Sequence, residues 1–245
     1  MPSLDDLKKR IASVKSTQKI TKAMKMVAAA KLRRAQENAE KGRPYSDKMN
    51  NIILNLSNGI ADKENAPQLL RGTGEDKTHL CIVLTSDRGL CGGFNTNIVK
   101  KAKAYFKQIS SKGKNLKIIT VGSKGYDQLK RFYKHKIIEK ISFKDSKTIN
   151  YLDAEKVGQM IINKFEKKEF DVCVIFYNQF KNVITQIPQE QKIIPLKDLE
   201  EESSAENNYE FEPDEDEILN NLLPKNISTQ IFKAMLENSA SEQGS

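Results

Sequence analysis

The sequence predicts an α/β protein in which long helices at both ends of the chain accompany a central domain with a mainly parallel sheet. Two observations support this fold class. From Ser3 to Lys41 the chain contains neither glycine nor proline, as is typical of one long helix. Between residues 77 and 197, short apolar stretches alternate with helical ones. Strands separated by helices of this length form parallel sheets.

The first segment, residues 1–58, is expected to be a shaft helix with a break near 42–44. Ser3 is a plausible N-cap for this helix. At 1.5 Å per residue the unbroken part would extend roughly 55–60 Å, too far for a domain of this size to cover. Gly42 and Pro44 are expected to interrupt it, and a shorter amphipathic stretch follows at Tyr45–Leu56.

The apolar residues of this helix follow a heptad spacing, three and four apart, which calls for a partner helix. They are Leu4, Leu7, Ile11 and Val14, and the register resumes at Ala28, Leu32 and Ala35. Basic side chains cover the other faces, since residues 1–44 contain twelve basic and four acidic residues. The sequence therefore predicts a basic rod that packs against another helix.

The central α/β domain is expected at residues 77–197, after a polar linker. Its buried strands are predicted at His79–Ser86, Leu116–Gly122 and Asp171–Tyr177. Helices are predicted at about 95–110, 123–133 and 153–168. Val183–Ile187 and Ile193–Leu196 could add edge strands, where Pro188 and Pro195 are tolerated.

Two further segments complete the chain. Residues 198–217 hold eleven acidic side chains and no basic one, which by itself is typical of a solvated loop. Residues 218–245 are expected to begin a second shaft helix, which passes Pro224 and resumes at Asn226. Its apolar face carries Ile227, Ile231, Met235 and Leu236.

Composition and charge narrow the possible functions. The net charge of +9 favours an anionic partner, which could be nucleic acid, a membrane surface or an acidic protein. The three cysteines have neither metal-type spacing nor a disulfide pattern, which indicates a reducing compartment. No run of eighteen apolar residues or signal peptide is found, so a cytoplasmic location is expected.

Residues for catalysis or metal binding are not expected. His79 and His135 have no second ligand at a suitable spacing, and a Cys–His nucleophile pair has only the presence of both residue types in its favour. The glycine-rich stretch Arg88–Asn95 (RGLCGGFN) follows a strand but lacks a dinucleotide or Walker-type pattern. A tight turn is as plausible there as a binding loop, and Arg88 suits a carboxylate better than a nucleotide.

Four stretches resemble the gamma subunits of rotary ATP synthases, and they occur in that family's order. They are Ile20–Arg34 (ITKAMKMVAAAKLRR), Thr85–Asn95 (TSDRGLCGGFN), Tyr209–Pro213 (YEFEP) and Leu236–Gln243 (LENSASEQ). The resemblance implies long N- and C-terminal helices forming an antiparallel coiled coil, plus a Rossmann-like α/β central domain.

The same resemblance implies a non-catalytic rotor shaft without a cofactor. The coiled coil would turn inside a ring of alpha and beta subunits, driven by the proton-translocating c-ring, and the epsilon subunit would bind near the foot. The partners would be these subunits and no nucleic acid. The protein would lie peripherally on the cytoplasmic face of a bacterial inner membrane.

The resemblance also assigns residues to these roles. Met24, Lys25, Lys31, Arg33 and Arg34 would face the alpha and beta subunits, and Arg88 would form a polar catch against a beta subunit. Glu210 and Glu212 would belong to the rotor foot. The coiled-coil seam would consist of Leu4, Leu7, Ile11 and Val14 together with Ile231 and Met235.

One departure and two alternatives complete the prediction. The family continues past Ser-Glu-Gln for several helical turns, whereas this chain ends at Ser245 within the second shaft helix. The chain is therefore expected to be a fragment or an interrupted reading of a longer gene. Each apolar side chain left uncovered would forgo about 1.5–3 kcal/mol. A nucleic-acid-binding protein would account for the basic helix but not for its heptad seam. A nucleotide-dependent enzyme on the central domain is the other alternative.

Overall fold

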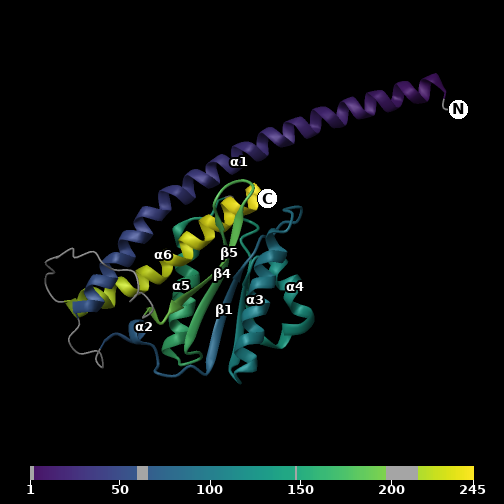
Figure 1. The fold of residues 1–245 in the computed structure, drawn as a ribbon. Coiled ribbons are helices and arrows are strands. Elements are labelled where there is room, and N and C mark those ends of the chain that lie inside the picture. Colours follow the sequence, from purple (N-terminus) through teal and green to yellow (C-terminus); the bar gives the residue numbers. More distant parts are fainter. Residues whose placement is uncertain (1–2, 60–65, 147, 197–214) are drawn as a thin grey trace.

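The computed structural model describes residues 3–59, 66–146, 148–196 and 215–245, and shows a very long helix lying along one side of an α/β domain (Figure 1). The helices are α1 (Leu4–Gly59), α2 (Gln68–Arg71), α3 (Phe94–Ser111), α4 (Ser123–Tyr133), α5 (Tyr151–Glu166) and α6 (Glu215–Gly244). The strands are β1 (Thr78–Leu84), β2 (Asn115–Val121), β3 (Ile137–Ile141), β4 (Val172–Phe180) and β5 (Gln186–Ile194). The predicted α/β class is confirmed.

The five strands form one sheet in the order β3-β2-β1-β4-β5. β1 to β4 are mutually parallel, and β5 pairs antiparallel with β4. The central strands are buried on both faces, which explains their nearly continuous apolar sequences. One face packs against α3 and α4, around Phe106 and Phe176. The other packs against α5 and α6, around Phe165 and Ile231.

The two shaft helices pack antiparallel, as predicted. Side-chain contacts join Arg43 to Glu237, Asp47 to Lys233 and Asn50 to Asn226. The residue numbers therefore rise along α1 while they fall along α6, as in an antiparallel pair. Apolar clusters extend the pairing in both directions. At one end Ile53 of α1 clusters with Leu219 and Leu223 of α6, and at the other end Ala39 of α1 clusters with Ala240 of α6.

The break expected at Gly42 and Pro44 is wrong, because α1 continues through both residues as one helix of 56 residues. Proline removes one backbone donor and crowds the preceding turn, which normally kinks or ends a helix. Here α6 lies alongside. A side-chain carbon placed on Gly42 would sit 3.0 Å from Leu236 of α6, so the two helices are in close contact at the expected break.

Three smaller expectations also change. Two separate edge strands were predicted, but β5 is one strand, with Pro188 accommodated at the edge of the sheet. Pro224 does not interrupt the last helix, because α6 runs continuously from Glu215 to Gly244. β3 was not predicted, since its sequence is short and mostly exposed. Within the described ranges, no helix has both the length and the apolarity needed to cross a membrane.

Candidate partner-binding surface

The first half of α1, Leu4–Lys31 (the bare half), is left uncovered by the other described residues. It projects beyond the α/β domain (Figure 1), and every residue from Leu4 to Lys31 is exposed. Ser3 caps the helix as predicted: its hydroxyl accepts a hydrogen bond from the Asp6 N–H, and its own N–H donates to the Asp6 carboxylate, both at 3.2 Å. This local capping box fixes where the helix begins.

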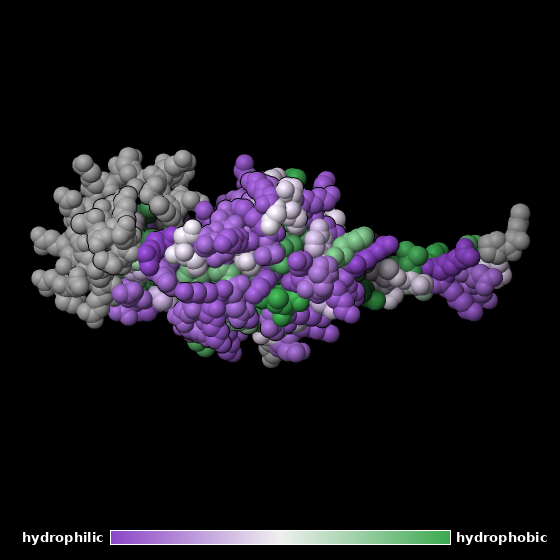
Figure 2. Space-filling model, turned by 90° about the horizontal axis from the view of Figure 1, so that it is seen from below, coloured by the Kyte–Doolittle hydropathy of each residue, from purple (hydrophilic) through white to green (hydrophobic). Residues whose placement is uncertain are grey.

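The predicted seam on this half is a row of uncovered apolar side chains. Leu4, Leu7, Ile11 and Val14 are 45–70% exposed, and Ile20, Met24 and Val27 continue the apolar surface along the helix. Figure 2 shows apolar patches on the rod that projects from the domain. Single exposed apolar residues are ordinary, but a row on an isolated helix marks a surface that a partner covers.

The basic residues of α1 that were expected to face the alpha and beta subunits divide into two groups. Lys25 lies beside Met24 on the bare half of α1. Arg33 is largely exposed and pairs with Glu37 one turn along at 2.9 Å, an exposed contact that contributes little to stability. Lys31 and Arg34 instead line a cavity between α1 and the domain.

This cavity has a volume of about 370 Å³ and lies at the carboxyl ends of β1 and β2. Three of the predicted partner-binding residues line it, namely Lys31, Arg34 and Arg88. Sequence reasoning assigned each of them separately and did not predict that the fold would gather them. Cations that converge from a helix and a loop can hold an acidic side chain.

Two carboxylates share the cavity with these cations. The Asp87 carboxylate is hydrogen-bonded within the domain. It accepts from the Ser123 N–H at 2.7 Å, the Ser142 hydroxyl at 2.9 Å and the Phe143 N–H at 3.1 Å. Burial raises the pKa of Glu242, and the positive charge of Arg88 partly offsets that rise.

The glycine-rich loop is held rigidly at its base and exposed at its tip. The Asn95 side chain accepts a hydrogen bond from the Ser86 N–H at 2.9 Å, which fixes the start of the loop. Leu90 is fully exposed and has a φ of 63°, so its backbone lies in the left-handed region. Arg88 lies on this loop as an exposed residue that lines the cavity, and the base of the loop is fixed at the end of β1.

The α6 residues assigned to the seam lie elsewhere. Ile231 and Met235 are buried in the core cluster formed with the sheet and α5. The α6 side chains that meet α1 in apolar clusters are Leu219, Leu223, Leu236 and Ala240. Both faces of α6 are apolar, so periodicity alone could not assign each face to its neighbour. Glu210 and Glu212 fall outside the described residues.

The residues considered for catalysis or metal binding include His79, Cys81 and Cys173. His79 is buried and hydrogen-bonds to Asp76 at 2.6 Å and to the Tyr105 hydroxyl at 2.8 Å. Cys81 and Cys173 are buried as free thiols. In the parts of the chain that the structure covers, His, Cys, Asp and Glu side chains form no group of three or more that could hold a metal ion.

Fold and surface together define a shaft protein: a helical rod, bare at one end and fastened at the other to an α/β domain. Comparisons with known proteins agree. The family model described as ATP synthase matches residues 3–245. The ATP synthase gamma chain of Pelagibacter ubique (strain HTCC1062) is 86% identical over 246 residues, covering 100% of this chain and 84% of the relative. That of Rhizobium etli (strain CIAT 652) is 52% identical, with the same shares covered.

A solved structure is similar in fold as well. The central stalk/c-ring structure of the Tetrahymena thermophila mitochondrial ATP synthase contains a chain that matches with a TM-score of 0.69 and 26% identity. The match covers 92% of this chain and 95% of that one. The chain therefore belongs to the ATP synthase gamma chain family, the central-stalk subunits of ATP synthase.

Proposed function

We propose that this chain is the non-catalytic rotor shaft of an ATP synthase, with the bare half of α1 inserted among the alpha and beta subunits. The observation that carries the proposal is the exposed apolar row Leu4–Val14 on a helix that its own domain leaves uncovered. Rotation of an asymmetric shaft would open and close catalytic sites on neighbouring subunits, so the shaft itself needs no catalytic residue.

The basic surface supports acidic protein partners. Met24, Lys25 and Arg33 would meet the alpha and beta subunits along the rod. Lys31, Arg34 and Arg88 would receive an acidic loop of a beta subunit at the cavity, because charge complementarity steers and aligns such contacts. Glu210 and Glu212 are proposed for the foot, next to the epsilon subunit and the c-ring. In the cell the chain would lie at the cytoplasmic face of a bacterial inner membrane, held there by the complex.

The test is co-purification. Affinity-tagged chain should recover alpha and beta subunits from a membrane extract, and the isolated chain should hydrolyse no ATP. A variant with Lys31, Arg34 and Arg88 all changed to Gln should recover less beta subunit. The matched control changes Lys100, Lys101 and Lys107 on α3 to Gln. Recovery of neither alpha nor beta subunit by the unmodified chain would refute the proposal.

A further inference from the structure

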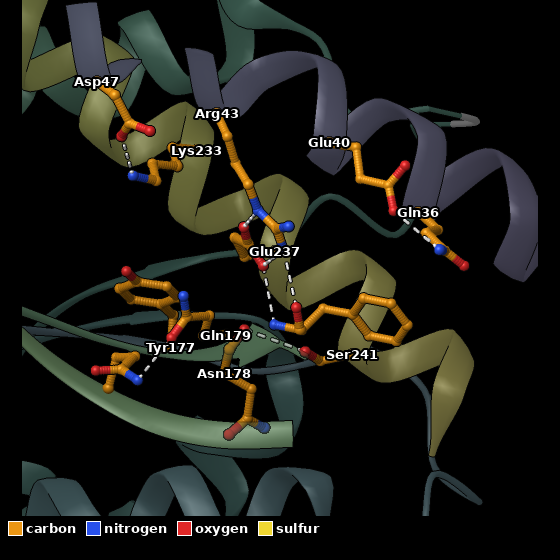
Figure 3. A network of polar contacts seen from close by, with 12 residues as sticks. Gln36, Glu40, Arg43, Asp47, Tyr177, Asn178, Gln179, Lys233, Glu237 and Ser241 are labelled. Atoms are coloured by element: carbon orange, nitrogen blue, oxygen red, sulfur yellow. Dashed lines mark hydrogen bonds and ion pairs between the residues drawn. The ribbon is translucent and has the colours of Figure 1, made fainter. Parts of the chain in front are cut away.

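One buried carboxylate joins the shaft helix to the sheet. Glu237 of α6 is only 1% exposed, and its oxygens accept hydrogen bonds from Arg43 Nε at 2.6 Å and Arg43 Nη2 at 3.1 Å. The same carboxylate accepts the Phe180 N–H of β4 at 2.8 Å. Arg43 Nη2 also donates to the Phe180 carbonyl at 2.8 Å. Figure 3 shows Arg43 extending from α1 onto Glu237, between the two helices and the strand.

This junction is a costly way to hold two helices together. Burying a carboxylate is unfavourable unless it is paired and hydrogen-bonded, and a pair of apolar side chains is often just as stabilising. The polar junction also fixes the orientation of the two helices relative to the strand. The two guanidinium donors and the Phe180 N–H can all reach the Glu237 carboxylate in only one arrangement. The hydrogen bond to Glu237 also raises the pKa of Arg43, so the guanidinium stays charged.

The junction lies next to the proline inside the shaft helix. Pro44 has no N–H, so the carbonyl of Glu40 lacks its helical donor, and the proline ring crowds the preceding turn. Arg43 is the residue just before this proline. One turn further along, Asp47 of α1 pairs with Lys233 of α6 at 2.8 Å. α6 therefore holds α1 on both sides of the proline.

We propose that Arg43 and Glu237 are positioning residues that brace the shaft helix at Pro44 and lock it to β4, so that the shaft and the α/β domain turn as one body. The inference rests on the proposed rotor function and adds where torque crosses between domain and shaft. Without the brace, α1 would bend at Pro44 and twist relative to the sheet. Rotation of the domain would then be transmitted incompletely to the bare half of the helix.

The experiment uses the assembled complex carrying Arg43→Gln. ATP hydrolysis should continue, while the number of ions pumped per ATP hydrolysed should fall by about twofold or more. Hydrogen exchange at the Phe180 amide should become about tenfold faster or more, because its acceptor is no longer held in place. Arg43→Lys keeps the charge but loses the fork of two donors, so it should give an intermediate pumping ratio. This second variant also serves if Arg43→Gln prevents assembly.

Rescue separates bracing from simple stability. Adding Pro44→Ala to Arg43→Gln restores the missing backbone hydrogen bond and should recover part of the pumping ratio. The control Lys41→Gln removes a nearby exposed charge and should leave the ratio unchanged. An unchanged ratio in Arg43→Gln, or a loss that Pro44→Ala does not relieve, would overturn the inference. Failure of the unmodified chain to recover alpha and beta subunits would instead refute the rotor function itself.

Discussion

The apolar row on the bare half of α1 gives the most direct prediction. Leu7 and Ile11 are 45% and 56% exposed, so about half of each side chain's surface is still available to a partner. Full burial of such a side chain contributes about 1.5–3 kcal/mol. The surface that the two side chains still have to bury together is about that of one whole side chain. Replacing both by Ala should therefore weaken binding to the alpha and beta subunits by about 1.5–3 kcal/mol, or roughly 10- to 100-fold.

The same change should have little effect on the isolated chain. Neither side chain is buried against the described part of the domain, and alanine has the highest helix propensity, so α1 is not weakened. The assay is a titration of labelled chain with alpha and beta subunits, accompanied by thermal unfolding of the chain alone. Ser13→Ala, which alters the same stretch of helix without removing apolar surface, is the matched control.

Two outcomes would contradict this reasoning. Undiminished affinity in the double variant would mean that the apolar row is not the interface. A fall in the melting temperature of the isolated chain by several degrees would mean that the row already packs against its own chain. Only weaker binding with unchanged thermal stability agrees with an apolar row that is exposed in the isolated chain and buried in the complex.

The remaining predictions concern the α/β domain. Gly122 has a φ of 95°, and an added side-chain carbon would lie 2.1 Å from a backbone oxygen, so Gly122→Ala should destabilise the chain by about 3 kcal/mol or more in urea unfolding. Gly113→Ala, in open space at a φ of 71°, should cost only about 1–2 kcal/mol. Burial lowers the pKa of His79, so its contribution to stability is complete above about pH 6.5 and declines as the pH falls below that value. The free energy of unfolding should depend less on pH near 6 in His79→Gln. Burial raises the pKa of the Cys81 and Cys173 thiols, and both should resist alkylation until the chain unfolds.

The sequence predicted those elements whose signal is local. The shaft helix followed from a long stretch without glycine or proline, and β1, β2 and β4 from short apolar runs. The contacts that keep α1 helical through Pro44 come from α6, nearly two hundred residues away. Because these contacts join distant segments, no local sequence pattern predicts them. β3 was missed for a related reason: Ile137–Ile141 is an edge strand whose middle residues are exposed, so it lacks the pattern of a buried strand.

The candidate surface was only partly predictable. Heptad spacing predicted Leu4, Leu7, Ile11 and Val14 as a seam for a partner helix, since spacing on one helix is a local property. In the structure these four side chains are exposed. The convergence of Lys31 and Arg34 with Arg88 depends on how α1 crosses the end of the sheet. It therefore needed the fold. Glu237, central to the polar junction, looked like one acidic residue in a helical stretch, and only its burial distinguishes it.

The position of α6 explains why the two halves of the shaft differ. α6 buries one face against the sheet and α5, through Ile227 and Ile231, and presents another face, with Leu236 and Ala240, to α1. The second half of α1 is thereby joined to the core of the domain, whereas the first half has no contact of that kind among the described residues. A torque applied to the bare half therefore enters the domain through the second half of α1, which contacts α6 and, at Arg43, β4 directly. Arg43 and Glu237 connect that contact directly to β4, close to the point where the bare half ends. Without this connection, α1 would be held to α6 by the Asp47–Lys233 and Asn50–Asn226 contacts and by apolar packing. Apolar packing resists separation well but opposes sliding and twisting with less directional specificity.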